Sequence, residues 1–355
     1  MRSPDNLPID ETASNRAITA HPTMRQVAER AGVSVALVSL VMREAPNVSV
    51  HRRRLVLEAA TELGYRPNVL ARNLASRRTR TIGIVVNDLH NPFFAECIDG
   101  LQEEADRTGY RLLLGNGKHS RSGEADALET FLQFRVDGLV LAGPTITTSS
   151  MEQAAGTTPI VIVGRKTRST KVDSVNTDDE SGAGLAVDHL VALGHRRIAH
   201  VDGGTGAGAS GRRQGYKRAM SMHGLEDQIM VASGDFSEAG GRAATVELLR
   251  LRPRPTAIFA SNDLSAVGAL DAIEDASMQV PRDMSIVGYD NTSLAALHHM
   301  SLTTIDQPRA DIGRMAIRLL LERLDGGRTG AVHHVVAPTL VERNTSRKPM
   351  AERRK

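Results

Sequence analysis

The sequence predicts an all-α helix-turn-helix headpiece followed by an α/β region of two lobes, each built on a doubly wound parallel sheet. Three observations lead to this fold class. The chain has 355 residues, which is more than one hydrophobic core usually holds. Two short helical patterns joined by a glycine lie near its start, and from Thr81 onward apolar strand patterns alternate with helical ones. Such alternation is typical of parallel sheets covered by helices on both faces.

The stretch from Thr23 to Met42 predicts the helix-turn-helix. Thr23 and Gln26 have the spacing of a capping box, Gly32 ends the first helix, and Ser34 can cap the second. The side chains of the second helix that we expect to pack on the first are Val38, Val41 and Met42. The side chains expected on the opposite face are Val35, Ala36, Ser39, Leu40 and Arg43. An ordinary helical hairpin is the alternative for this stretch taken alone.

The segments around this motif complete a headpiece over residues 22–66. Residues 1–21 mix Ser, Asn, Asp and Pro without periodicity, which predicts a disordered leader. Ser49 can cap a third helix, whose expected buried stripe is Val56, Ala59, Ala60 and Leu63. Residues 67–80 hold a short helical pattern that Asn68 can cap and that is unstable alone. We expect either a hinge helix that orders on DNA or against a second copy of the chain, or a flexible linker.

The rest of the chain repeats a strand and helix pattern twice. In the first lobe we expect strands at 82–86, 111–114, 138–142 and 160–163, and helices at 94–107 and 124–134. In the second lobe we expect helices at 181–193, 213–223, 238–251 and 264–276, and strands at 197–201, 256–260 and 284–289. Two doubly wound units predict a ligand cleft at the carboxyl ends of the strands. A basic tail covers residues 346–355.

Charge and cysteine content narrow the class of protein. The net charge is only +3, yet positive residues gather at 51–54 and 72–80 with almost no acid nearby, which favours a polyanionic partner over a merely solvated face. Cys97 is the only cysteine, so disulfides within the chain are excluded and a reducing compartment is expected. The sequence shows neither a signal-peptide pattern nor a membrane-spanning apolar run, so we expect a soluble cytoplasmic protein. We expect no metal site, because the histidine pairs at 298–299 and 333–334 are adjacent residues whose side chains diverge.

Seven short motifs follow one another in a recognisable order. They are Ala31-Gly-Val-Ser34, Val38-Ser39, Leu63-Gly-Tyr-Arg-Pro-Asn68, Asn91-Pro-Phe-Phe94, His189-Leu-Val-Ala-Leu-Gly-His195, Ser285-Ile-Val-Gly-Tyr-Asp290 and Leu302-Thr-Thr-Ile-Asp-Gln-Pro308. From about residue 23 to residue 345 the chain resembles the lactose-repressor (LacI) family of bacterial transcription regulators. The resemblance implies an effector-binding and dimerisation domain over 81–345 that is similar to periplasmic binding proteins. Its first lobe would cover about 81–177 and 307–324, and its second about 178–305 and 326–345.

The resemblance implies that two segments contact operator DNA. In the family the second helix enters the major groove, and a hinge helix from each subunit of a homodimer inserts a leucine into the minor groove, where it bends the DNA. Leu74 matches that wedge. The positions that match phosphate contacts are Thr23, Asn47, Ser49 and Arg52. The remaining positions expected to contact DNA are Ser34, Val35, Ala36, Leu37, Ser39, Leu40, Arg43, Asn68 and Arg72.

The second helix departs from the common family pattern. The family often carries Thr and Arg where this chain has Leu37 and Leu40, and the usual base-reading positions are Val35 and Ala36. These side chains can only touch thymine methyl groups or leave room for another group. We hypothesise that Arg43 supplies a polar contact to a base or a phosphate in their place.

The resemblance also implies a ligand site between the lobes. The matching positions are Asn91, Phe93, Phe94, Arg165, Arg212, Phe236, Asn262, Asp263, Asp290 and Gln307. A guanidinium, an amide and a carboxylate around an aromatic wall suit a sugar, a nucleoside or a similar small polar molecule. As alternatives, Phe93 and Phe94 are ordinary core residues and Asp290 caps a following helix. The family often carries an acid where this chain has Gly164, and the next residue, Arg165, either favours an anionic ligand at this edge or is solvent-exposed.

Two rival functions remain open at this point. Residues 206–211 fit the glycine fingerprint of dinucleotide-binding enzymes, although that turn normally opens its domain and is followed by an acid at the end of the second strand. A solute-binding protein without DNA binding would need export and would leave the headpiece unexplained. We therefore expect a homodimeric repressor without a cofactor or catalytic residues, whose small-molecule effector decides whether the hinge helices form.

Overall fold

The computed structural model describes residues 22–66 and 78–350, and the chain divides into one compact unit that ends at Thr79 and a second that begins at Arg80. The predicted leader and most of the predicted hinge lie outside the described residues, and so do the last five residues of the tail. The same holds for the predicted DNA contacts Asn68, Arg72 and Leu74.

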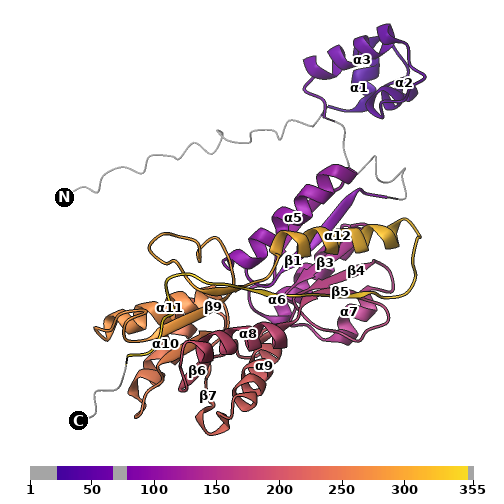
Figure 1. Ribbon diagram of the computed structural model, residues 1–355. Coiled ribbons are helices and arrows are strands. Elements are labelled where there is room, and N and C mark those ends of the chain that lie inside the picture. Colours follow the sequence, from indigo (N-terminus) through magenta and orange to yellow (C-terminus); the bar gives the residue numbers. More distant parts are fainter. Residues whose placement is uncertain (1–21, 67–77, 351–355) are drawn as a thin grey trace, which may run out of the picture. The chain divides into compact units, whose positions relative to one another are not determined.

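The first unit contains the helices α1 (Met24–Ala31), α2 (Val35–Met42) and α3 (Val50–Glu62) (Figure 1). The three predicted caps are confirmed. The side chain of Thr23 accepts a hydrogen bond from the backbone of Gln26, whose own side chain accepts one from the Thr23 backbone. The hydroxyl oxygens of Ser34 and Ser49 accept the backbone N–H groups of Leu37 and Arg52, at 3.2 Å and 3.4 Å.

A small aliphatic core holds these helices together. Its fully buried members are Val27, Ala28, Val38, Val41, Val56, Ala59 and Ala60. Each helix contributes two or three of them from one face, as the sequence pattern predicts. Gly32 ends α1 with a φ of 65°, a conformation that glycine adopts without strain, and this lets the chain turn into α2.

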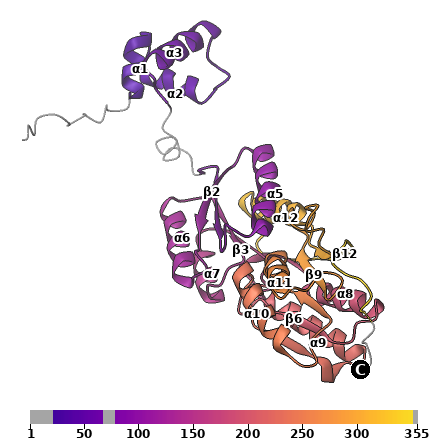
Figure 2. The same ribbon diagram turned by 90° about the vertical axis from the view of Figure 1, so that its left-hand side faces the viewer.

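The first lobe of the second unit is a parallel sheet with the strand order β11-β5-β4-β3-β1-β2. Its strands are β1 (Thr81–Val86), β2 (Arg111–Asn116), β3 (Gly138–Ala142), β4 (Ile160–Val163), β5 (Asp173–Thr177) and β11 (His333–Val336). Its helices are α5 (Pro92–Thr108), α6 (Arg121–Gln133), α7 (Thr148–Ala154) and α12 (Arg309–Leu324). Figure 2 shows α5 and α12 on one face of the sheet and α6 and α7 on the other.

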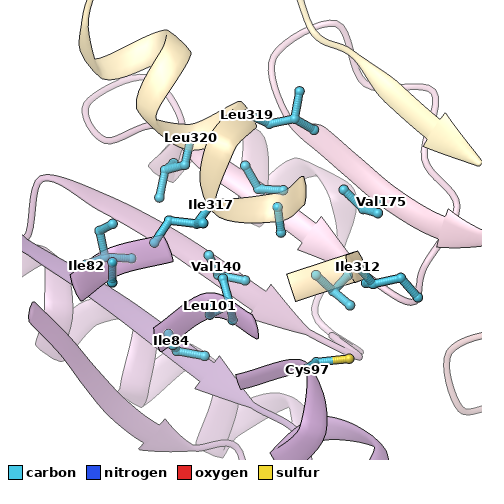
Figure 3. Close-up of a cluster of buried hydrophobic side chains, with 14 of the residues drawn as sticks. Ile82, Ile84, Cys97, Leu101, Val140, Val175, Ile312, Ile317, Leu319 and Leu320 are labelled. Atoms are coloured by element: carbon cyan, nitrogen blue, oxygen red, sulfur yellow. The ribbon is translucent and has the colours of Figure 1, made fainter. Parts of the chain in front are cut away.

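Alternate residues of the strands build the two cores of this lobe. Ile82 and Ile84 of β1 pack under α5 and α12 together with Leu101 and Leu320 (Figure 3), whereas Val85 packs with the α6 and α7 side chains. This two-residue period is that of a strand buried on both faces. α5 and α12 approach closely, because a Cβ atom at Gly100 would lie 2.0 Å from the carbonyl oxygen of Ala310.

The second lobe is a sheet with the order β12-β10-β9-β8-β6-β7, in which only β12 runs antiparallel to its neighbour β10. Its strands are β6 (Ile198–Val201), β7 (Met230–Ala232), β8 (Ala257–Ala260), β9 (Ser285–Asp290), β10 (Thr304–Asp306) and β12 (Thr339–Val341). Its helices are α8 (Asp179–Ala192), α9 (Ala209–Met222), α10 (Glu238–Arg250) and α11 (Asp263–Asp275). The predicted fold class, a helical headpiece and two doubly wound sheets, is confirmed.

The structure corrects the predicted assignment of one segment. Residues 326–345 were expected in the second lobe, but β11 pairs with β5, so residues 333–336 belong to the first sheet. The chain therefore passes between the lobes three times, after Thr177, after Asp306 and after Val336. No helix of the described residues is long and apolar enough to span a membrane.

Candidate functional site

The outward face of α2 is the first candidate site. Val35 and Leu40 are 44% and 40% exposed, although both are large apolar side chains. Ala36 and Ser34 are also exposed, and Leu37 and Ser39 are half-buried. Arg43 follows the helix, and its Nε donates a 3.2 Å hydrogen bond to the backbone oxygen of Ser39. All of these predicted DNA contacts therefore reach solvent.

The predicted phosphate contacts lie close to helix ends. Thr23 and Ser49 are the N-caps of α1 and α3, and both are exposed, as are Asn47 and Arg52. A helix N-terminus presents free backbone N–H groups and the positive end of the helix dipole, which favour a phosphate. The geometry is therefore compatible with phosphate contacts at these four positions, which remain predictions.

The second candidate site is a cavity of about 500 Å³ in the second unit. It lies at the carboxyl ends of strands from both sheets, since its lining includes residues that directly follow β1, β3, β4 and β10. Parallel sheets usually bind ligands at this edge. Seven of the predicted ligand residues line it: Asn91, Phe93, Phe94, Arg212, Phe236, Asp290 and Gln307.

Arg212 is the fixed positive charge of the cavity. Only 6% of it is exposed, and its Nε donates a 3.0 Å hydrogen bond to Asp179 Oδ1. Its Nη1 donates to the backbone oxygen of Ser261 and lies 3.5 Å from Asp290 Oδ1. Burial opposes the charge, but the carboxylates of Asp179 and Asp290 more than offset this and raise the pKa of Arg212. The guanidinium carbon also lies 3.8 Å from the centre of the Tyr289 ring, so its position is held from several sides.

Asp290 is the central carboxyl group of the cavity, at the end of β9. Gln307 Nε2 donates a 2.6 Å hydrogen bond to its Oδ1, and the hydroxyl of Thr177 donates a 2.5 Å bond to Gln307 Oε1. Asp290 has a φ of 107°, a strained conformation for a residue with a side chain. Burial raises its pKa to about 8. A turn and not a helix follows it, so the alternative role as a helix cap is not supported.

Two phenylalanine rings form the apolar walls, one from each lobe. Phe94 lies over Gly143, where a Cβ atom would come within 2.6 Å of the ring. Phe236 lies over Gly203 and Gly206, where a Cβ atom would come within 2.3 Å and 2.7 Å. Phe93 is 6% exposed and belongs to the core of the first lobe, and its ring meets that of Phe94 edge to face at 5.2 Å. The alternative that these phenylalanines are core residues therefore holds in part for Phe93.

Packing accounts for the glycine fingerprint of residues 206–211, which lies in the same loop as Gly203. Gly206 makes room for the Phe236 ring, and a Cβ atom at Gly211 would lie 2.8 Å from the Cβ of Asp179. Gly208 precedes α9 with a φ of 83°. The loop falls in the second lobe, late in the chain, and its glycines bring α9 close to α8. Nothing in this arrangement requires a dinucleotide.

Three predicted ligand residues do not line the cavity. The Arg165 guanidinium turns to the loop after β3, where it donates to the backbone oxygen of Ile146. Asn262 caps α11, and its Nδ2 donates a 2.9 Å hydrogen bond to the Phe236 backbone oxygen. Asp263 accepts hydrogen bonds from the backbone of Thr292 and from the hydroxyl of Thr304, both at 2.7 Å. The polar atoms of these side chains are hydrogen-bonded to neighbouring loops, so the side chains support the walls of the cavity instead of facing a ligand.

Several lining residues were not predicted. They are Asn87, Asp88, His119, Thr145, Thr177, Asp179, Asp235 and Ser237. Asn87 and Asp88 directly follow β1, and Asp88 Oδ1 lies 3.2 Å from His119 Nε2. The oxygen of the Asn87 side chain is buried and has no hydrogen-bond partner among the described residues. For Asn87 and Asp88, the position directly after a buried strand is the signal that would have identified them.

A buried acid outside the cavity shapes one of its walls. Glu124 of α6 is 1% exposed, and its carboxylate accepts hydrogen bonds from the backbone and hydroxyl of Thr145 and from the backbone of Ile146. This fixes the loop after β3 that carries Thr145. Within residues 22–66 and 78–350 we find no group of three or more His, Cys, Asp or Glu side chains placed to hold a metal ion.

Comparisons with known proteins match both units of the chain. The family model described as bacterial regulatory proteins, lacI family, matches residues 23–68, and that of the periplasmic binding protein-like domain matches residues 187–346. Catabolite control protein A of Priestia megaterium is 35% identical over 85% of this chain and 92% of its own length. The HTH-type transcriptional repressor CytR of Escherichia coli (strain K12) is 34% identical over 92% of this chain and 96% of its own.

A solved structure agrees with this assignment. The Lac repressor dimer bound to operator and the anti-inducer ONPF has a TM-score of 0.82 to this chain at 29% identity, over 92% of this chain and 99% of that one. The relatives therefore match this chain over both units, the helix-turn-helix and the two-lobed domain. This chain belongs to the lacI family of bacterial regulatory proteins and is a DNA-binding transcription regulator.

Proposed function

We propose that this protein represses transcription by binding operator DNA as a homodimer, and that a small polar ligand in the cavity controls this binding. The single observation that carries the ligand control is the cavity itself, which places Arg212, Asp290 and the rings of Phe94 and Phe236 around one space. A regulator of this kind works on the bacterial chromosome, in the cytoplasm. No specific observation favours either rival function.

The chemistry of the lining supports a ring-shaped polar ligand such as a sugar or a nucleoside. Phenylalanine faces pack against the flat or C–H-rich face of a ring, while a carboxyl and a guanidinium bind its hydroxyl groups. Asp290 is oriented by Gln307 and lies beside Arg212, so both polar groups are fixed before a ligand arrives. Fixed polar groups beside apolar walls give orientation and specificity at a low entropic cost.

An exposed sheet edge supports the homodimer. β2 is the last strand of the first sheet, and it presents Leu113 and Leu114 with 40% and 51% of each residue exposed. Monomers rarely leave large apolar side chains together on an unpaired edge, because the edge then pairs with another chain. A second copy of this chain would cover these leucines by a two-fold related contact.

The proposed control needs only a difference in ligand affinity between two arrangements of the lobes. Ligand binding would favour one arrangement, change the spacing of the two first lobes in the dimer, and so decide whether the hinge segments around Leu74 fold into the minor groove. A coupling free energy of about 1–3 kcal/mol would change operator affinity about 5- to 150-fold.

Two measurements on the full chain test this function. Binding to random duplex DNA should occur at low salt and weaken steeply as salt rises, because phosphate contacts release counterions. Thermal unfolding screened against sugars, polyols, nucleosides and sugar phosphates should show a stabilising ligand, which should then change operator affinity. A ligand that stabilises wild type and Arg212→Ala equally would bind elsewhere and contradict the assigned cavity. Absence of DNA binding at low salt would contradict the repressor function.

A further inference from the structure

The outward face of α2 is unusual for a surface that meets a polyanion. None of the eight residues Val35–Met42 carries a charge, and the large apolar side chains of Val35 and Leu40 are 44% and 40% exposed. Successive helical residues turn by about 100°. The exposed residues Val35, Ala36 and Leu40 therefore share the half of the helix opposite to the buried Val38 and Val41. The fold consequently presents an uncharged stripe, in which the half-buried Ser39 is the one polar side chain of α2, and the exposed residues of this stripe are not part of the headpiece core.

Charge around the stripe indicates which partner covers it. Arg43 follows α2 directly, Arg52 lies in the first turn of α3, and both are exposed. Neither takes part in an ion pair among the described residues. By contrast, the exposed arginines Arg25 and Arg54 have Glu29 and Glu58 beside them, at 3.7 Å and 3.8 Å. An uncharged stripe with an unpaired arginine at its end, and a second one at the start of α3, fits a DNA groove, where a guanidinium can reach a base edge or a phosphate, whereas a protein partner would not need these cations.

The major groove offers one apolar group, the 5-methyl group of thymine. Guanine, adenine and cytosine present hydrogen-bond donors and acceptors there. Covering those polar groups with Val35 or Leu40 would remove them from water without replacing their hydrogen bonds, which is costly. Covering a thymine methyl group removes apolar surface from water on both sides of the contact, which is favourable.

We propose that Val35, Ala36 and Leu40 read thymine methyl groups, so that this protein selects operator half-sites with thymines at the positions that face the start and middle of α2. The inference rests on the proposed DNA-binding function and deepens it. Leu40 has the most central place in the proposal, because its side chain is long enough to reach a base edge and has no polar atom with which to read any other base.

The test begins with the full-length protein and a library of random duplex DNA, from which binding sites are selected. Each thymine of the selected site is then replaced singly by deoxyuridine, which removes the methyl group and keeps the base pair. At the thymines under α2, each replacement should weaken binding about fourfold, the effect expected for the loss of one buried methyl group. Replacements at the other thymines of the site should change affinity less than twofold.

Paired variants identify the side chain responsible. In Leu40→Ala, uracil at the contacted thymine should no longer matter, because protein and base then lack the two groups that touch. Leu57→Ala is the matched control, since Leu57 is a leucine of similar exposure, 47%, that lies on α3. It should keep the full sensitivity to uracil. The uracil scan on the wild-type protein remains decisive even where a variant folds poorly.

The outcomes separate this inference from the proposed function. Selected sites that bind tightly and tolerate uracil at every thymine would overturn methyl reading and leave the repressor function standing. Sites without thymine under α2 would overturn it as well. Failure to bind any duplex at low salt would overturn both, and would favour a protein partner for the stripe.

Discussion

Glu96 of α5 and Arg309 at the start of α12 form a close ion pair, with 2.6 Å between Oε2 and Nε. The pair lies where the chain crosses between the lobes. The other carboxylate oxygen of Glu96 accepts a 2.8 Å hydrogen bond from the backbone of Ser293 in the second lobe. Arg309 Nη1 donates to the backbone oxygen of Asp290. A helix of the first lobe is thus connected through two side chains to the strained residue whose carboxyl group lies in the cavity.

This connection predicts a specific loss in Glu96→Ala. Ligand contact at Asp290 would reach α5 less effectively, so the ratio of operator affinities without and with ligand should shrink. A reduction of about 2- to 30-fold corresponds to about 0.5–2 kcal/mol of coupling. The measurement is operator binding by fluorescence anisotropy with and without the ligand found by thermal screening. The matched control is Glu103→Ala, also on α5, whose partner Arg314 lies in the same lobe. An unchanged ratio in Glu96→Ala would show that the pair does not transmit the signal.

The buried carboxyl group of Asp290 predicts a pH dependence of stability. Its pKa is raised to about 8 by burial, whereas an unfolded chain releases this proton near the ordinary value of about 4. Between these values the folded state binds more protons than the unfolded state, so the free energy of unfolding should fall as pH rises from about 4 to about 8. Asp290→Asn should flatten this slope in urea unfolding across the same range. An identical slope in the variant would assign the effect to other groups.

A second buried acid predicts a large loss of stability. Asp173 is fully buried, and its carboxylate meets Arg328 at 2.7 Å and 3.0 Å and Arg323 at 2.8 Å. Asp173→Asn would leave two buried or partly buried guanidinium groups without their shared counter-charge, which should cost about 3–5 kcal/mol. Asp311→Asn removes an exposed partner of Arg314 and should cost less than about 1 kcal/mol. Denaturant unfolding of both variants provides the comparison, and similar losses would contradict the assignment.

The proposed dimer surface predicts the effect of one charge on the sheet edge. Leu114→Asp on β2 should shift the protein toward monomers, because a carboxylate would have to be buried in the contact. Operator affinity should fall with it, since each monomer contacts one half-site. Sedimentation velocity gives the oligomeric state. Met222→Asp on α9, at another exposed apolar position, should remain dimeric. A dimeric Leu114→Asp would place the interface elsewhere.

The guanidinium of Arg43 can contact either a base or a phosphate of the operator, and we expect the base contact. Its Nε is held by Ser39, which leaves the two terminal nitrogens of the guanidinium for DNA. A base contact would make Arg43→Ala lose about 1–3 kcal/mol on the selected operator and much less on random duplex. Equal losses on both DNAs, with a smaller salt slope, would instead identify a phosphate contact.

The sequence was sufficient for the parts of the fold that local chemistry determines. The caps at Thr23, Ser34 and Ser49 were predicted from short spacings, and each is formed. Of the strands buried on both faces, β1, β3 and β4 were predicted from their apolar runs, whereas β5 was not, because most of its buried residues are polar. β11 could not be placed this way, because its residues are exposed or half-buried and its partner β5 lies about 160 residues earlier in the chain. Pairing over that distance depends on tertiary packing.

The residues of the cavity likewise divide into those that the sequence predicted and those that depend on tertiary packing. Residues of the quoted motifs, such as Phe94 and Gln307, were expected at the site and line it. The orientation of Arg165 and Asp263 could not be read from the sequence, because polar atoms of neighbouring loops compete for their side chains. Asp179 was missed because it starts a helix, where an acid is already explained by the helix dipole.

The three passages between the lobes lie against one another, since Thr177 bonds to Gln307 and the backbone of Asp178 bonds to that of Val336. Three crossover segments that lie side by side form a hinge that bends about one axis and resists twisting. A truncation immediately before residue 333 would remove β11 and β12, which are edge strands of the first and the second sheet. Neither lobe can therefore be excised as an intact piece of this protein.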